Sequence, residues 1–121
     1  MNKIPAYVSS WTDKYFHHSA FDIPLGYPNK KTVKFLAQLK KKRSVKLYRG
    51  LNKYNKGEEV ISSWTYNKKV AKNYAGREGI IVSQNFEPKN IILDTTILNS
   101  VQKKMLGYDY KIDDKEVLIF N

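Results

Sequence analysis

Alternating apolar and polar residues predict several strands in the second half of the chain. Val45-Lys46-Leu47-Tyr48-Arg49 has the period of two that is typical of a half-buried strand, and Gly50 permits the bend that would end it. Further strands are predicted for the runs of β-branched and apolar residues at 60–65, 79–86, 90–94 and 117–120. Strands are therefore expected to outnumber helices after residue 45.

Helical periodicity appears before this strand-rich part. A helix is predicted to begin at Asn29 or Thr32 and to run through Lys42, because apolar residues recur on one side of it and lysines on the other. The segment up to Pro28 mixes aromatic residues, prolines and polar residues, so we expect short helices or turns there.

A second helix is predicted after the strand that ends with Thr65. It begins at Asn67 or Thr65 and ends at Gly76, which can adopt the backbone conformation of a helix stop. Its apolar face contains Val70, Ala71, Tyr74 and Ala75. We expect Tyr74, and Trp64 in the preceding strand, to lie in the core.

Length and residue types limit the class of protein. The chain has 121 residues, of which 41% are hydrophobic, and this suffices for one core and a single domain over 1–121. Because cysteine is absent and the only histidines are the adjacent His17 and His18, we expect no disulfide and no metal site. No apolar run is long enough to span a membrane, and the N-terminus lacks the apolar stretch of a secretory signal. We therefore expect a soluble, cytoplasmic protein.

The chain is strongly basic. Its 22 lysines and arginines against 11 acidic residues give a formal net charge of +11. Such a surface suits a polyanionic partner: nucleic acid, a protein bound to nucleic acid, or an acidic protein face. Abundant lysine is equally typical of an AT-rich genome, in which it serves only for solvation. Composition does not separate these two explanations.

Three polar motifs occur in a fixed order on predicted strands. They are Arg49 followed by Gly50, then Ser63-Trp64-Thr65, then Asp114-Lys115-Glu116. The second motif leads directly into the predicted helix with its Val-Ala and aromatic-Ala face. In this order and context, the motifs resemble the Arg/Ser-x-Ser/Glu signature of mono-ADP-ribosyltransferases, especially small phage or bacterial intracellular members. The resemblance covers residues 45–121, and residues 1–44 match no pattern.

Members of this family break the nicotinamide–ribose bond of NAD and transfer ADP-ribose to an acceptor. The resemblance implies an α+β fold, with a two-sheet β core around an NAD cleft and a few N-terminal helices. It also implies NAD as co-substrate and a cytoplasmic location, which is the host cytoplasm if a phage encodes the protein.

The resemblance assigns a role to each motif residue. Glu116 would stabilise the positive charge of an oxocarbenium-like transition state and bind the ribose hydroxyl. Ser63 would hydrogen-bond Glu116 and fix its orientation, and Thr65 would support the same region. Arg49 would bind phosphate and ribose oxygens with its planar fork, and Gly50 would let its backbone approach the nicotinamide amide.

Other residues are implied on the acceptor side. Asp114 stands two residues before Glu116, where many members that modify arginine carry Glu, and its carboxylate can activate an acceptor nucleophile. The segment 100–112 occupies the position of the acceptor-recognition loop. Within it, Tyr108 and Tyr110 are candidates to contact the acceptor, and we expect one of them to anchor the loop on the core instead. The expected acceptor is a protein or nucleic acid, either acidic or associated with nucleic acid.

Each motif residue also has an ordinary structural explanation, so other functions stay open. The chain could be a pseudoenzyme, a basic nucleic-acid-binding or protein-binding inhibitor module without turnover, or an NAD glycohydrolase in which water replaces the acceptor. A binding module should tolerate Glu116→Gln and lose activity when Lys40 to Arg43 are changed, whereas an enzyme should behave in the opposite way.

A second copy of the serine motif provides a rival assignment. Ser9-Ser10-Trp11-Thr12 is identical to Ser62-Ser63-Trp64-Thr65, so Ser10 and Thr12 could take the roles given to Ser63 and Thr65. Only the later copy follows Arg49 and leads into the predicted helix, and we therefore assign the roles to it.

Overall fold

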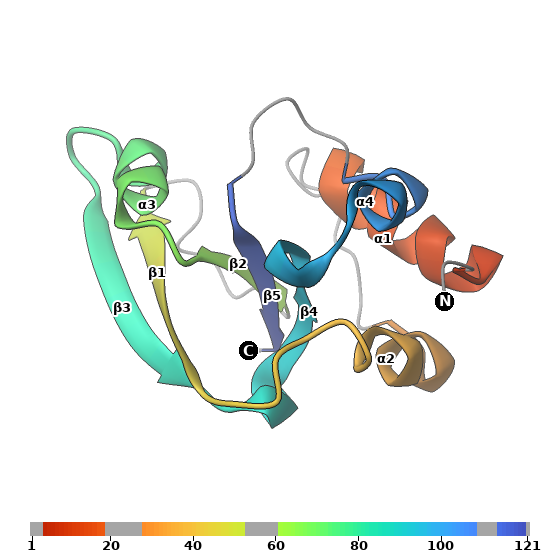
Figure 1. Cartoon of the computed structure of the whole chain (residues 1–121). Coiled ribbons are helices and arrows are strands. Elements are labelled where there is room, and N and C mark those ends of the chain that lie inside the picture. Colours follow the sequence, from red (N-terminus) through yellow and green to blue (C-terminus); the bar gives the residue numbers. More distant parts are fainter. Residues whose placement is uncertain (1–3, 19–27, 53–60, 109–113, 121) are drawn as a thin grey trace.

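A computed structural model of the chain describes residues 4–18, 28–52, 61–108 and 114–120. The described strands form one five-stranded antiparallel sheet in the order β3-β1-β2-β5-β4 (Figure 1). The strands are β1 (Val45–Leu51), β2 (Ile61–Thr65), β3 (Ile80–Phe86), β4 (Ile91–Asp94) and β5 (Glu116–Phe120). The α-helices are α1 (Ala6–His18), α2 (Lys30–Leu36), α3 (Lys68–Ala75) and α4 (Ser100–Met105), and short 3-10 helices are η2 (Pro88–Asn90) and η3 (Thr95–Ile97). The expected α+β class is confirmed.

The sheet is continuous but unevenly joined. β1 pairs with β3 along its whole length, from Val45 opposite Phe86 to Leu51 opposite Ile80, and β2 pairs with β5 along its whole length as well. Between β1 and β2, the register within these described strands consists of Tyr48 opposite Thr65. We call the two parts the β3–β1 ladder and the β2–β5–β4 ladder. The two separate packed sheets expected from the resemblance are not what the described strands form, because this pairing connects the two ladders.

Helix α2 begins where the sequence predicts and ends earlier. Asn29 caps it, since its side chain accepts a hydrogen bond from the backbone N–H of Thr32 at 2.8 Å. The helix ends at Leu36 instead of Lys42. The carbonyl of Leu39 accepts from the N–H of Asp94 at 3.0 Å, so this backbone is used to attach the chain to β4 and is not available to continue the helix.

Helix α3 lies against the β3–β1 ladder. Asn67 caps it through the N–H of Lys69, and Gly76 ends it with a φ of 70°, as the sequence predicts. Gly50 does not end β1, which continues to Leu51. A Cβ at this glycine would lie 2.0 Å from the carbonyl oxygen of Ala71, so the absence of a side chain lets the α3 backbone approach β1.

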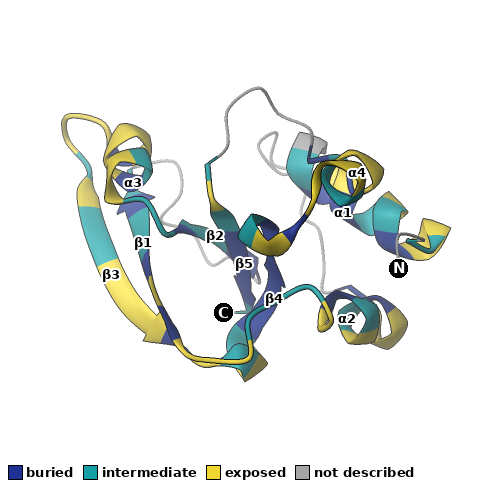
Figure 2. Ribbon diagram, in the orientation of Figure 1, coloured by how far each residue is buried: buried dark blue, intermediate teal, exposed yellow. Residues whose placement is uncertain are grey.

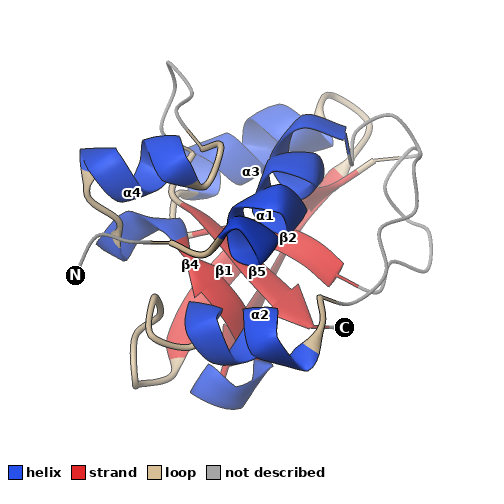
Figure 3. Ribbon diagram, turned by 90° about the vertical axis from the view of Figure 1, so that its right-hand side faces the viewer, coloured by secondary structure: helices blue, strands red, loops and turns tan. Residues whose placement is uncertain are grey.

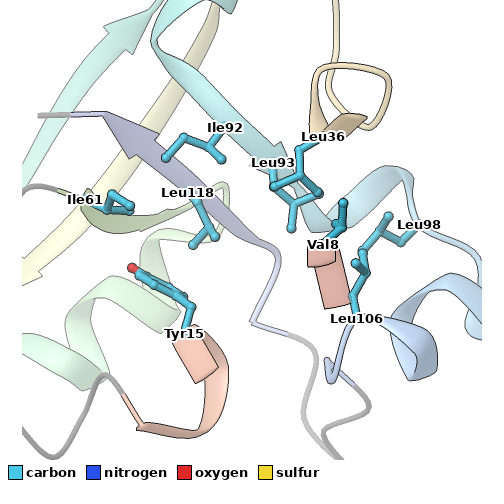
Figure 4. Close-up of a cluster of buried hydrophobic side chains, with 9 residues drawn as sticks. All are labelled: Val8, Tyr15, Leu36, Ile61, Ile92, Leu93, Leu98, Leu106 and Leu118. Atoms are coloured by element: carbon cyan, nitrogen blue, oxygen red, sulfur yellow. The ribbon is translucent and has the colours of Figure 1, made fainter. Parts of the chain in front are cut away.

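Helices α1, α2 and α4 lie beside the β2–β5–β4 ladder, while α3 lies at the other end of the sheet (Figures 1 and 3). The main buried cluster joins these helices to the ladder. Its members are Val8, Tyr15, Leu36, Ile61, Ile92, Leu93, Leu98, Leu106 and Leu118 (Figure 4). A second cluster fills the opposite face of β5, between the two ladders: Val45, Leu47, Phe86, Ile91, Val117 and Ile119, with Trp64 and Tyr66 packed against it. Buried positions therefore concentrate on β4 and β5, and β3 is mostly exposed (Figure 2).

None of the helices within the described ranges has the length and apolar character needed to cross a membrane.

Candidate functional site

Strand pairing brings two of the three sequence motifs together. Thr65 is opposite Tyr48 of β1 on one side and opposite Glu116 of β5 on the other. Ser63 lies two residues before Thr65 on β2, so strand alternation directs Ser63, Thr65 and Glu116 to the same face of the sheet. All three positions lie on strands, and the last strand begins at Glu116, one residue before its predicted start.

Glu116 has an unusual electrostatic environment. Burial of its carboxyl group raises its pKa to about 7, and the nearby charge of Asp114 acts in the same direction. A side-chain hydrogen bond with Ser63 acts against these effects, because it favours the ionised carboxylate. Glu116 therefore changes its charge near neutral pH, in the range where an acid, a base or an electrostatic stabiliser is useful.

A third hydroxyl joins this pair from the N-terminal part of the chain. The Oη atom of Tyr15 lies 2.7 Å from the Oγ atom of Ser63, and Tyr15 is only 7% exposed. Figure 4 shows the Tyr15 ring extending from α1 toward Ile61 of β2 and Leu118 of β5. Residues from α1, β2 and β5 thus form one hydrogen-bonded series: Tyr15, Ser63 and Glu116.

The turn before Glu116 is fixed by threonine hydroxyls. Thr65 Oγ1 donates to the carbonyl oxygen of Asp114 at 2.6 Å, and Thr95 Oγ1 donates to the carbonyl oxygen of Glu116 at 2.6 Å. Between these two anchors, Lys115 has a φ of 49°, a left-handed conformation that is uncommon for a residue with a side chain. Thr65 therefore makes a contact that positions the backbone of Asp114 next to Glu116.

Helix α3 holds the side chain of Asp114. Tyr74 Oη donates to Asp114 Oδ2 at 2.7 Å. The prediction that Tyr74 lies in the core is wrong, since it is 58% exposed and its hydroxyl is directed to this carboxylate. Trp64 is partly buried and packs against the second cluster, where its ring meets the Phe86 ring edge-on with 4.8 Å between the ring centroids.

Arg49 is near this site in the sheet but is not on the same face. It follows Tyr48, which is the residue opposite Thr65, so alternation along β1 directs Arg49 to the other face, with Val45 and Leu47. Gly50 is packed against α3, which explains this glycine without a ligand. The structure therefore brings Ser63, Thr65, Asp114 and Glu116 together on the paired strands β2 and β5 and the turn before β5. Arg49 lies outside this group, on the opposite face of the sheet.

The tyrosines predicted on the acceptor side divide between the core and the part outside the description. Tyr108 is 2% exposed and packs on Phe16 with a ring-centroid distance of 4.7 Å, so it anchors the segment after α4 and does not present its ring to an acceptor. Tyr110 lies outside the described residues. Part of the predicted loop is the helix α4, whose start is fixed by a capping box between Asn99 and Gln102.

The rival serine motif is on a helix. Thr12 is buried in α1 and donates to the carbonyl of Ser9, and Ser10 is exposed on the same helix. These residues do not occupy the strand position that the resemblance requires. In the described part of the chain, no group of three or more His, Asp or Glu side chains could hold a metal ion.

The sequence analysis did not identify Tyr15 and Thr95 as residues of the site, and it did not predict that Tyr74 is directed to Asp114. A signal for Tyr15 was present, because Val8, Trp11, Thr12 and Tyr15 recur at helical spacing and all four are buried or partly buried on α1. Thr95 and the orientation of Tyr74 depend on contacts between distant segments, which periodicity does not reveal.

Comparison with known proteins adds no relative: no family model, no curated protein and no solved structure matches this chain.

Proposed function

We propose that this protein is a mono-ADP-ribosyltransferase that cleaves the nicotinamide–ribose bond of NAD and transfers ADP-ribose to a macromolecular acceptor. The observation that carries the proposal is the pairing of β2 with β5, which places Thr65 opposite Glu116 and puts Ser63 on the same face of the sheet, next to the partly buried Glu116. The resemblance of the three motifs predicts the pair of Ser63 and Glu116, and the two residues come from segments that are far apart in the sequence.

The chemistry requires a carboxylate in this environment. When the bond between nicotinamide nitrogen and ribose carbon breaks, its electron pair leaves with neutral nicotinamide and the ribose ring becomes positively charged. An ionised Glu116 stabilises that charge, and partial burial strengthens the interaction because little water screens it. Ser63 keeps the carboxylate in one orientation, so the site needs little reorganisation during the reaction.

Asp114 completes the transfer in this proposal. The new bond joins the ribose carbon to an acceptor oxygen or nitrogen, and the acceptor must lose a proton to a base. Asp114 is suited to this role because Thr65 fixes its backbone and Tyr74 fixes its carboxylate. Tyr74 is exposed beside it and takes the acceptor-side position that we predicted for Tyr108.

In this proposal Arg49 still binds NAD, although it does not lie on the face of the sheet that carries Glu116. Its planar fork suits NAD phosphates, and on β1 it follows Tyr48, which pairs with Thr65 of β2 in the described part of the sheet. Arg49 and Glu116 are on opposite faces of the sheet, so NAD bound at Glu116 would reach Arg49 only by extending around the place where the two ladders separate. The acceptor is a protein or nucleic acid, and the net charge of +11 favours an acidic one.

The test is the transfer of label from tagged NAD to a bacterial lysate, with the protein and nucleic-acid fractions measured separately. We compare wild type with Glu116→Gln, and Glu87→Gln serves as the control because it changes an exposed carboxylate outside the site. We expect wild type and the control to label one fraction and Glu116→Gln to lose about 100-fold or more of the rate.

Two other outcomes have defined meanings. Release of nicotinamide without labelling would replace the transferase with an NAD glycohydrolase. If NAD stays intact with wild type, the enzymatic proposal is wrong and a basic binding module becomes the better explanation.

A further inference from the structure

The N-terminal helix contributes a buried hydroxyl to the candidate site, although no motif marked that helix. Tyr15 Oη is 2.7 Å from Ser63 Oγ, and Ser63 is in turn hydrogen-bonded to the carboxyl of Glu116. We propose that Tyr15 is a positioning residue: it fixes the direction of the Ser63 hydroxyl and thereby favours the ionised form of Glu116.

The direction of the hydrogen bonds follows from the number of protons. A serine hydroxyl has one proton, and an ionised carboxylate can only accept. When Ser63 donates its proton to Glu116, the contact with Tyr15 must be made by a lone pair of Ser63, so Tyr15 is the donor. The series therefore runs from Tyr15 to Ser63 to Glu116, and each bond polarises the next.

Packing makes Tyr15 rigid enough for this role. Its ring stacks on Trp11 at 5.5 Å between centroids and meets the edge of Phe16 at 5.7 Å. It also belongs to the main buried cluster together with Leu118, which is opposite Ser63, and Ile61, which lies two residues before Ser63 on β2 (Figure 4). A side chain confined in this way loses little additional freedom when it holds Ser63.

Other groups also act on Glu116, and the test must separate them from Tyr15. Ser63 contacts its carboxyl directly, the charge of Asp114 acts from the preceding turn, and Tyr74 of α3 acts through Asp114. Thr65 and Thr95 bind backbone carbonyls of this turn. Tyr15 differs from Asp114, Tyr74 and the two threonines because its effect must pass through the hydroxyl of Ser63.

The consequence for catalysis rests on the proposed function, but the effect on Glu116 does not. The experiment is therefore an NMR titration of the Glu116 carboxyl carbon in the full chain, without NAD. Tyr15→Phe removes the hydroxyl and keeps the ring, and Tyr7→Phe is the matched control because Tyr7 is 45% exposed on the same helix. We expect Tyr15→Phe to raise the pKa of Glu116 by roughly half a unit, the effect of one weakened hydrogen bond, and Tyr7→Phe to leave it unchanged.

A double-mutant cycle distinguishes positioning from a general structural effect. In a Ser63→Ala background, Tyr15→Phe should cause no further shift, because the group through which it acts is absent. An unchanged titration in Tyr15→Phe, or an equal shift with and without Ser63, would overturn the proposal.

Wild type provides a second measurement that needs no variant of Tyr15. The ring carbon that carries the Tyr15 hydroxyl should show an inflection at the titration of Glu116, and this inflection should disappear in Glu116→Gln. Its absence in wild type would also overturn the proposal. If NAD is not cleaved at all, the proposed function fails and these titrations still decide the role of Tyr15.

Discussion

Glu116 combines two properties that oppose each other in the folded protein. Its carboxyl is removed from water, which disfavours its charge, and it is placed where the proposed reaction needs that charge. The sign of the resulting stability effect follows from proton binding. Because the folded protein binds this proton more tightly than the unfolded chain, the stability associated with Glu116 is present below about pH 4.5 and is lost as the pH rises through about 7.

Glu116→Gln should therefore stabilise the protein above neutral pH while it abolishes the proposed activity. Glutamine has nearly the same shape and can still accept from Ser63, but it carries no charge to desolvate. We expect the free energy of unfolding of wild type to fall by about 2 kcal/mol relative to Glu116→Gln between pH 5 and pH 8.

Urea unfolding of both proteins across this pH range is the measurement. Glu87→Gln is again the control, because an exposed charge is hydrated in the folded and the unfolded state alike. A difference between wild type and Glu116→Gln that does not change with pH would contradict the assigned environment of Glu116.

Two of the basic residues at 40–43, Lys40 and Lys41, have structural roles, which matters for tests of the basic surface. Lys40 Nζ donates to the carbonyl oxygens of Pro88 and Ile91, and burial lowers its pKa. Lys41 Nζ lies 4.2 Å from the centre of the Tyr66 ring. These two lysines hold the chain after α2 against the sheet. Replacement of the whole segment would therefore change folding as well as charge.

Helix α3 acts on the site through Asp114, as α1 does through Ser63. It contacts β1, β2 and β3, and its Tyr74 binds Asp114. Its approach to the sheet depends on Gly50, where any Cβ would meet backbone atoms of Ala71 and Ala75. Those atoms cannot move away independently of the helix, because they belong to its hydrogen-bonded backbone.

Gly50→Ala should therefore displace α3 and cost about 3 kcal/mol or more of unfolding free energy. Thermal and urea unfolding provide the measurement. Ser83→Ala, an exposed change on the neighbouring strand β3, is the control and should stay within about 0.5 kcal/mol of wild type. A Gly50→Ala protein as stable as wild type would contradict this account of how α3 packs.

Local sequence signals predicted the elements well and their mutual contacts poorly. The caps at Asn29 and Asn67 and the stop at Gly76 were predictable, since each depends on residues within one turn. The end of α2 was not, because it depends on Asp94 far along the chain. The pair of Ser63 and Glu116 was expected because both belong to motifs with a known order, whereas Tyr15, which contacts Ser63 from 48 positions away, belongs to no motif.

At the scale of the whole molecule, charge is a property that could select the acceptor of the proposed transfer. Three exposed lysines, Lys68, Lys69 and Lys72, lie on α3, the helix that carries Tyr74. A matched set of three exposed lysines, Lys30, Lys31 and Lys34, lies on α2 at the other end of the molecule (Figure 1). Replacement of either set by glutamine lowers the net charge equally.

Replacement of the α3 lysines should slow labelling of an acidic acceptor by roughly tenfold at low salt, and replacement of the α2 lysines should slow it much less. The physical reason is proximity, because in the proposed transfer attraction close to Asp114 would guide the acceptor to the reacting atoms. Labelling rates at low and high ionic strength are the measurement, and the difference between the two variants should shrink as salt is added. Equal losses would indicate that only the total charge matters.

The pairing of Tyr48 with Thr65, which connects the β3–β1 ladder to the β2–β5–β4 ladder, affects how firmly the two ladders are held together. Most strands in a sheet are held at a fixed spacing by a row of backbone hydrogen bonds, but within the described strands the two ladders share one register pair and are otherwise connected by the packing of α3 and of the second cluster. Side-chain packing resists a small rotation less than a full hydrogen-bonded row does. Within the described strands, the contact between β1 and β2 is therefore the least extensively paired part of the sheet, and a ligand that contacted residues of both ladders would add a further connection between them.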